Sequence, residues 1–137
     1  MSFSDISDGL VKTIKISGLK VYGIKNLPDK LSPPAVVVVL GETPYHRAFG
    51  SNPYPADPAW RIIVLLGHQD TPSSANRMLE YIEPGGKSSI VKQIEDDPTL
   101  AGTCSGAIVT RNFGLGVTNW GGIPYLSTEF ELEVKSL

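Results

Sequence analysis

The chain contains little of what several classes of protein depend on. Its 137 residues include a single cysteine, Cys104, which cannot form an intramolecular disulfide, so nothing in the composition requires an oxidising compartment. The longest apolar run, residues 35–40, is far shorter than the roughly 20 residues that a membrane-spanning helix needs. The first residues, MSFSDISDG, hold no basic stretch followed by an apolar one, so we expect no secretory signal.

The chain also lacks a large excess of either sign of charge. The chain has 12 basic and 14 acidic residues, a net charge of −2, and no basic tract. Proteins that grip duplex DNA need clustered lysine and arginine to neutralise phosphates, so the charge pattern argues against that class. With 41% hydrophobic and 19% charged residues, the chain has the composition of a globular protein. Length and composition together predict one domain, residues 1–137, around one core.

Common catalytic and cofactor motifs are missing too. The sequence has no G-x-G-x-x-G, P-loop, H-E-x-x-H, C-x-x-C or G-x-S-x-G pattern. His46 and His68 would need Asp70 or Glu42 and a further ligand to hold a metal, and we expect neither metal nor cofactor. Cys104 could be drawn as a nucleophile with His68, but a lone cysteine before an apolar strand is typical of a small buried side chain. We therefore expect no enzymatic activity.

The neighbouring carboxylates Asp96 and Asp97 also suit acid–base chemistry poorly. Adjacent positions on a helix point about 100° apart, which is a poor geometry for a catalytic pair. The pattern predicts a solvated helix end that leads into an Asp-Pro turn.

What is present is a succession of periodic segments. An apolar stripe of Ile6, Leu10, Val11 and Ile14 predicts an amphipathic helix, with Gly18 as its C-cap. In a second helix, Ala75, Met78, Leu79 and Ile82 are expected on one face. The segments predict helices within 4–18, 70–86 and 85–98, and strands within 19–28, 33–42, 59–67, 102–114 and 124–136, with a Gly-rich connection at 115–124. The fold class is therefore α+β: a single mixed or antiparallel sheet of about five strands packed against an N-terminal helix and a pair of short central helices.

The last strand alternates most clearly. One face is apolar, and the other carries Glu129, Glu131 and Glu133. Such a row of glutamates is usually only a solvated sheet face. A second interpretation is a surface that repels a polyanion moving past it.

A long loop, residues 41–58, joins two apolar strands. A connection of this length without regular structure is commonly functional. It contains Tyr45, Arg47, Phe49 and Tyr54, and Trp120 lies in the later Gly-rich connection. These residue types are enriched in protein interfaces, although each aromatic ring could also fold back onto the core. We predict that these five residues contact another subunit or a partner protein.

Two segments resemble a known family. Residues 78–109, MLEYIEPGGKSSIVKQIEDDPTLAGTCSGAIV, and residues 122–134, GIPYLSTEFELEV, are similar to the tail terminator (tail completion) proteins of long-tailed bacteriophages. The likeness covers the order of elements along about the whole chain, but specific residues in only part of it. One departure is Ala101, where the family pattern leads us to expect a second glycine. The matching residues are Gly86, Ser89, Ile90, Glu95, Asp97, Pro98, Thr99, Leu100 and Gly102, together with the closing strand from Tyr125 to Val134.

The resemblance implies a structural virion protein. Its members form a ring, generally hexameric, on the head-proximal end of the tail tube, where the ring stops tube polymerisation and joins the head. The implied partners are other copies of the chain, the tail tube protein and a head–neck connector or head-closure protein. DNA would pass through the lumen without specific binding, past the three glutamates, and no membrane is involved. The implied location is the head–tail neck of the virion, after assembly in the host cytoplasm.

Other functions stay open at this point. A head-closure or neck adaptor that binds the portal side is the nearest alternative. A small ligand-binding domain or an enzyme built around Cys104 and His68 is a more distant one.

Overall fold

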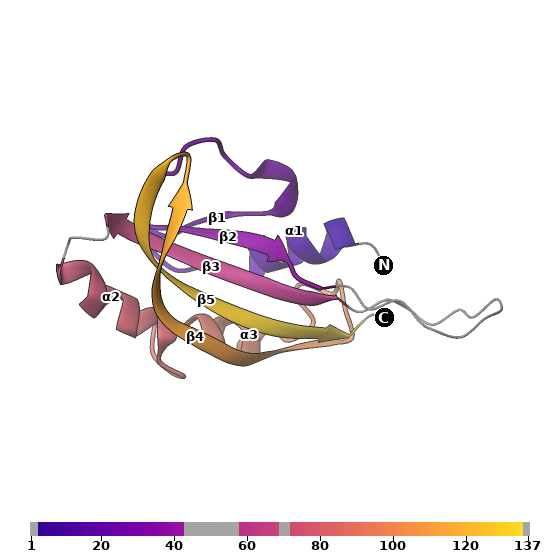
Figure 1. Ribbon diagram of the computed structural model, residues 1–137. Helices are drawn as coiled ribbons and strands as arrows, with labels where there is room; N and C mark the ends of the chain where they lie inside the picture. The colour runs from indigo at the N-terminus through magenta and orange to yellow at the C-terminus, as the bar shows by residue number, and fades with distance from the viewer. Residues whose placement is uncertain (1–2, 43–57, 69–71, 136–137) are drawn as a thin grey trace.

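The computed structural model describes residues 3–42, 58–68 and 72–135 and has the α+β fold that the sequence predicts. All the strands that it describes belong to one five-stranded sheet, and the helices pack against it (Figure 1). The elements in chain order are α1 (Phe3–Thr13), β1 (Lys20–Tyr22), the short 3-10 helix η1 (Ile24–Asn26), β2 (Ala35–Leu40), β3 (Ala59–His68), α2 (Pro72–Ile82), α3 (Ile90–Asp96), β4 (Gly106–Trp120) and β5 (Ile123–Lys135).

The strand order across the sheet is β1-β2-β3-β5-β4. Strand β1 runs parallel to β2, and every other neighbouring pair is antiparallel. The sheet is therefore mixed, with β3 at its centre and β1 and β4 at its two edges. The β-branched runs of β2 and β3 predict buried strands, and residues 35–38 of β2 are fully buried.

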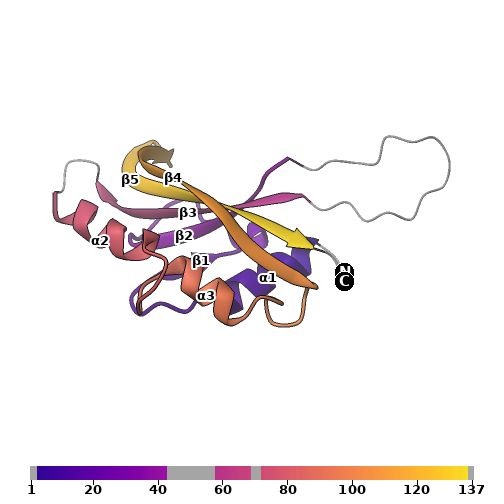
Figure 2. The ribbon, with the colours of Figure 1, turned by 90° about the horizontal axis from the view of Figure 1, so that it is seen from below.

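The helices α1, α2 and α3 all cover the same face of the sheet (Figure 2). The main core lies between this inner face and the helices, and its largest buried members include Ile6 and Leu10 of α1, Trp60 of β3 and Phe130 of β5. A smaller apolar cluster lies on the outer face, around Leu31, Ala35, Val37, Leu65 and Tyr125. The first helix and the central pair thus take the places that the periodicity predicts.

The first helix ends earlier than predicted. It stops at Thr13, five residues before Gly18, so Gly18 is not its C-cap. The amide of Lys15 donates to the side-chain oxygen of Gln93 in α3, at 3.4 Å, instead of to a helical carbonyl. Ile16 is still buried in the main core, so the chain leaves the helix in order to bring this side chain inward. Gly18, with φ +79°, lies in the turn that leads to β1.

One position of α2 is also assigned to the wrong face. Leu79 is 50% exposed, whereas Met78 and Tyr81 are buried. The buried stripe therefore follows the i, i+3 spacing from Met78 to Tyr81, and the adjacent Leu79 points away from the sheet.

The largest error concerns residues 115–124. The Gly-rich stretch that looks like a connection is mostly strand, because β4 runs through to Trp120. Gly114, with φ +82°, sits at an irregularity in the β4–β5 register, between Asn112 and Leu115. Only Gly121 and Gly122 form the turn, with φ values of +58° and +81°, as a two-residue hairpin turn of type I′ requires.

The closing strand matches its prediction. Along β5, Thr128, Phe130, Leu132 and Val134 are buried on the inner face, and the glutamates alternate with them on the outer face. No helix among the described residues is both long enough and apolar enough to cross a membrane.

Candidate functional site

The three glutamates of β5 share the outer face with two arginines. Arg61 of β3 forms an ion pair with Glu129 at 3.1 Å, and Arg111 of β4 forms one with Glu131. The ring of Phe113 lies between the two guanidinium groups, whose carbon atoms are 5.2 and 5.3 Å from the ring centroid. Such distances are typical of cation–π contacts. The register explains this cluster, because Arg61 and Arg111 both stand opposite Glu131.

The cluster changes the charge of the predicted DNA-repelling face. Glu133 is exposed, and Lys135 lies next along the same face of β5. The three glutamates are thus balanced by Arg61, Arg111 and Lys135. The sequence interpretation missed the arginines because they belong to strands that are distant along the chain. That this face repels DNA stays a prediction, and its field is weaker than three unpaired glutamates would create.

A second cluster is formed by the turn that follows α3. Asp97 Oδ2 accepts hydrogen bonds from the amide of Ala101, at 3.0 Å, and from the hydroxyl of Thr13 in α1, at 3.1 Å. Its other oxygen, Oδ1, accepts from the Thr99 hydroxyl at 3.3 Å. Asp97 is therefore a half-buried structural group that ties the turn to α1. The predicted Asp-Pro turn at the end of the helix is confirmed, but Asp97 is less solvated than the sequence suggests. Asp96 is exposed and pairs with Lys92, one turn earlier, as a solvated helix end requires.

The start of α3 is fixed in a similar way. Ser89 is fully buried, and its Oγ accepts the amide of Lys92 at 3.1 Å, as an N-cap does. The same hydroxyl donates to the carbonyl of Glu83, just after α2. One side chain thus both caps α3 and joins it to the preceding helix. This is the structural role of the Ser-Ile pair in the family-like segment.

The turn itself has an unusual backbone. Leu100 and Ala101 both have positive φ values, +50° and +59°, and Gly102 follows with +81°. Leu100 is fully buried in the main core, so its side chain anchors the turn. A Cβ atom on Gly9 of α1 would lie 2.3 Å from the Leu100 carbonyl oxygen, which shows how closely helix and turn approach. Ala101, where the family pattern leads us to expect glycine, therefore has a backbone conformation that favours glycine.

Cys104 is enclosed just before the start of β4, beside the turn that follows α3. Its side chain is buried, and its Sγ donates to the carbonyl of Pro98 at 3.7 Å. Burial raises the pKa of the Cys104 thiol above its usual value, and the nearby charge of Asp97 adds to the increase, although a hydrogen bond from the Gly106 backbone opposes it. The protonated, enclosed thiol is thus held as a small apolar group, as the sequence suggests.

Several predicted residues lie outside the described part of the chain. These are Tyr45, Arg47, Phe49, Tyr54, His46, Asp70 and the side chain of His68. Within the described residues, no group of three or more His, Cys, Asp and Glu side chains is arranged to hold a metal ion.

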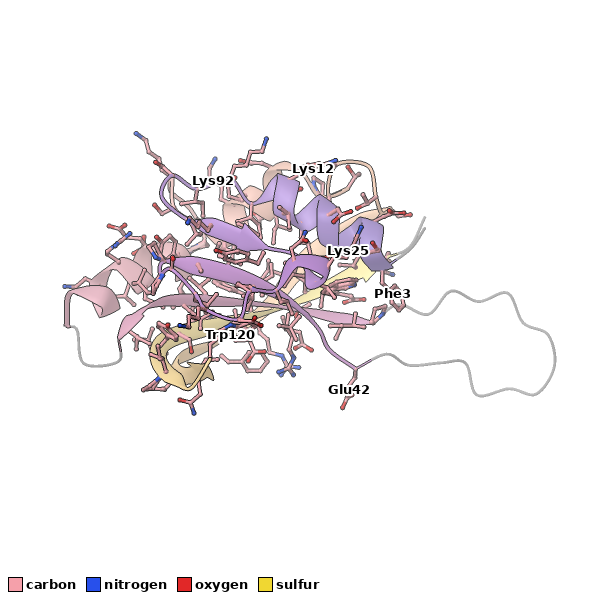
Figure 3. The ribbon with its side chains drawn as sticks, turned by 90° about the horizontal axis from the view of Figure 1, so that it is seen from above. Phe3, Lys12, Lys25, Glu42, Lys92 and Trp120 are labelled. Atoms are coloured by element: carbon pink, nitrogen blue, oxygen red, sulfur yellow. The ribbon has the colours of Figure 1, made fainter. Side chains whose placement is uncertain are left out.

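Trp120, the remaining interface candidate, is half-buried. Its indole N–H donates to the carbonyl of Pro28 at 2.8 Å, and its ring packs against the outer apolar cluster. Trp120 lies at the tip of the β4–β5 hairpin, which curls over the end of the sheet (Figures 1 and 3). Its described contacts are thus within the chain, and a contact with a partner stays a prediction.

The edge strand β4 has a feature that the sequence interpretation missed. It carries four exposed large apolar side chains, of Ile108, Phe113, Leu115 and Val117, with exposed fractions between 47% and 58%. Leu115 and Val117 could not be recognised because residues 115–124 are predicted as a connection. Exposed apolar residues on an edge strand are typical of a surface that another chain covers.

Comparison with known proteins finds no family model that matches the chain and no characterised protein with significant sequence similarity.

Proposed function

We propose that the chain is the subunit of a ring that closes the head-proximal end of a phage tail tube. The observation that carries this proposal is the open sheet, which ends in two edge strands, β1 and β4, with exposed apolar side chains on β4. A subunit that contacts its neighbours through two different surfaces builds a ring when the rotation closes. The resemblance of residues 78–109 to tail terminator proteins suggests that this ring is a tail terminator.

The proposed action is mechanical. The ring binds the last layer of tube subunits, ends polymerisation and leaves a surface for the head–neck connector. The rigid join of α2, α3 and the following turn, made by Ser89 and Asp97, supports this role because a ring needs subunits of fixed shape. DNA passes through the lumen without sequence-specific contacts. The functional location is the head–tail neck of the virion.

The loop at 41–58 is the proposed arm toward a neighbouring subunit, the tube or the neck. Tyr45, Arg47, Phe49 and Tyr54 supply the residue types found at the energetic centres of interfaces. We assign the arm to a partner contact on its sequence alone.

The test is native mass spectrometry of the purified chain, alone and mixed with tubes assembled from the tube protein encoded in the same genome. A hexamer, or a monomer that becomes a ring on the tube end, is the expected result. Electron microscopy of the mixture should then show tubes that no longer lengthen when more tube protein is added. A chain that stays monomeric and leaves tube growth unchanged contradicts the proposal. Binding to the portal side, with no effect on tubes, would instead indicate a neck adaptor.

A further inference from the structure

The two edges of the sheet differ in shape in a complementary way. Beside β1, the end of α1 and the following turn form a shallow, open groove of about 380 Å³. It is lined by Val11, Ile14, Lys15, Ile16, Ser17, Leu19 and Val21. At the other edge, Leu115 and Val117 project from β4 with about half of their surfaces exposed. One edge therefore offers an apolar depression and the other apolar side chains.

The two edges also differ in charge, because one carries lysines and the other is nearly uncharged. Residues 9–28, which include the groove and β1, contain four lysines and no acidic residue: Lys12, Lys15, Lys20 and Lys25. One of these lysines, Lys25, forms an ion pair with Asp8 of α1 at 3.2 Å. Lys12 and Lys25 are seen on the side of the molecule that α1 and η1 form (Figure 3). At the opposite edge, β4 carries one charge, Arg111, which pairs with Glu131.

The directions of the strands also fit. Strand β4 is antiparallel to β5, and following the pairings across the sheet shows that β4 runs opposite to β1. If β1 of a second copy continued the sheet beyond β4, the new pair would be antiparallel, which is the commoner arrangement.

Continuing the sheet also brings the two apolar surfaces onto the same side. Leu115 and Val117 stand opposite Thr128 and Leu126, whose side chains belong to the inner, helix-covered face. The groove lies on that face too, because α1 forms one of its walls.

We infer that the β4 edge of one copy, through Leu115 and Val117, docks into the groove between α1 and β1 of a second copy. The contact uses two different surfaces, so each copy has one groove and one β4 edge to offer. This inference rests on the proposed ring and identifies the surface through which its subunits join.

Disulfide trapping tests the contact directly. Ser17 lines the groove and Val117 lies on β4, so the double variant Ser17→Cys with Val117→Cys should give a ladder of linked dimers, trimers and higher species on mild oxidation. Neither single variant should give a ladder, because position 17 of one copy lies next to position 117 of another copy and not next to a second position 17. The native Cys104 is buried and serves as the constant background. Linked dimers from Val117→Cys alone would overturn the inference, since they would mean that two β4 edges meet each other.

A pair of charge variants gives a second, independent readout. Leu115→Asp should weaken self-association at least tenfold by placing a carboxylate in the apolar contact. Ile108→Asp is the matched control, because Ile108 is equally exposed on β4 but lies on the outer face, opposite Glu133. Equal effects of the two variants would overturn the inference. Native mass spectrometry and tube capping by the same samples separate failure of this contact from failure of the proposed function. Rings or caps that form without the Ser17–Val117 link contradict only this contact. The absence of rings and caps from the unmodified chain contradicts the proposed function.

Discussion

Ala101 adopts a left-handed backbone that costs an alanine free energy. Its φ of +59° places Cβ close to the following carbonyl, which costs a non-glycine residue about 1–2 kcal/mol. Glycine avoids this penalty but loses more conformational entropy on folding, about 0.5–1 kcal/mol. Ala101→Gly should therefore stabilise the chain by roughly 0.5–1 kcal/mol, measured by urea unfolding.

The adjacent residue provides the reciprocal control. Gly102 has φ +81°, and a Cβ placed there meets no atom within 4 Å, so Gly102→Ala adds backbone strain without a steric clash. It should destabilise the chain by about 1 kcal/mol. If both variants shift the unfolding midpoint in the same direction, the backbone of Ala101 is not strained as we infer.

At the residue scale, the sequence predicted single side chains unevenly. It placed Ile6 and Leu10 in the core correctly, because a helix repeats every 3.6 residues and burial follows that repeat. It could not distinguish Asp96 from Asp97, because the partner that holds Asp97 is Thr13, 84 positions away. A hydrogen bond between distant segments leaves no periodic trace in the sequence.

At the scale of elements, Asp97 determines how α3 is held against α1. Asp97→Ala removes three hydrogen bonds to a carboxylate, one of them to α1, and should cost about 2 kcal/mol of unfolding free energy. Asp96→Ala is the matched control, because it removes only an exposed pair with Lys92, worth about 0.5 kcal/mol or less. Urea unfolding followed by circular dichroism measures both. Similar losses for the two variants would mean that the contact with Thr13 contributes nothing.

The strands show where element prediction succeeds and where it fails. The β-branched runs of β2 and β3 and the alternation of β5 identified these strands, because each pattern reports burial on one or both faces of a sheet. The second half of β4 was assigned to a connection because Gly114 and Gly116 interrupt its pattern. Its pairing with β5 creates the strand, and that pairing depends on the tight turn at 121–122. Because this half of β4 is not predicted as a strand, the sequence also does not predict that Leu115 and Val117 lie on an exposed edge.

At the scale of the whole molecule, the tip of the β4–β5 hairpin joins distant parts of the chain. The hairpin curls across the end of the sheet (Figure 1), and Trp120 bonds to Pro28, 92 positions earlier. Gly121 approaches the same segment so closely that a Cβ atom would lie 2.8 Å from the Asp29 carbonyl oxygen. The tip is therefore docked onto residues 28–31, beside the outer apolar cluster, and does not project freely.

The two turn glycines allow this docking to be measured. Both have positive φ values, but a Cβ atom on Gly122 would meet no atom within 4 Å. Gly122→Ala should cost only the backbone strain, less the entropy that alanine saves, which is about 1 kcal/mol as at Gly102. Gly121→Ala should cost the same strain plus the loss of docking, roughly 1 kcal/mol more, because the clash lies against backbone that cannot rotate away.

Amide hydrogen exchange would locate the difference. In Gly121→Ala the amides of residues 115–120 should exchange faster than in Gly122→Ala, while those of α1 and β3 should exchange alike in the two variants, because undocking loosens the hairpin without opening the main core. Equal protection of residues 115–120 in both variants would show that the tip is held by its turn alone. Because Leu115 and Val117 lie in this half of β4, a loosened tip should also weaken self-association, so the docking of the tip would control the edge through which copies join.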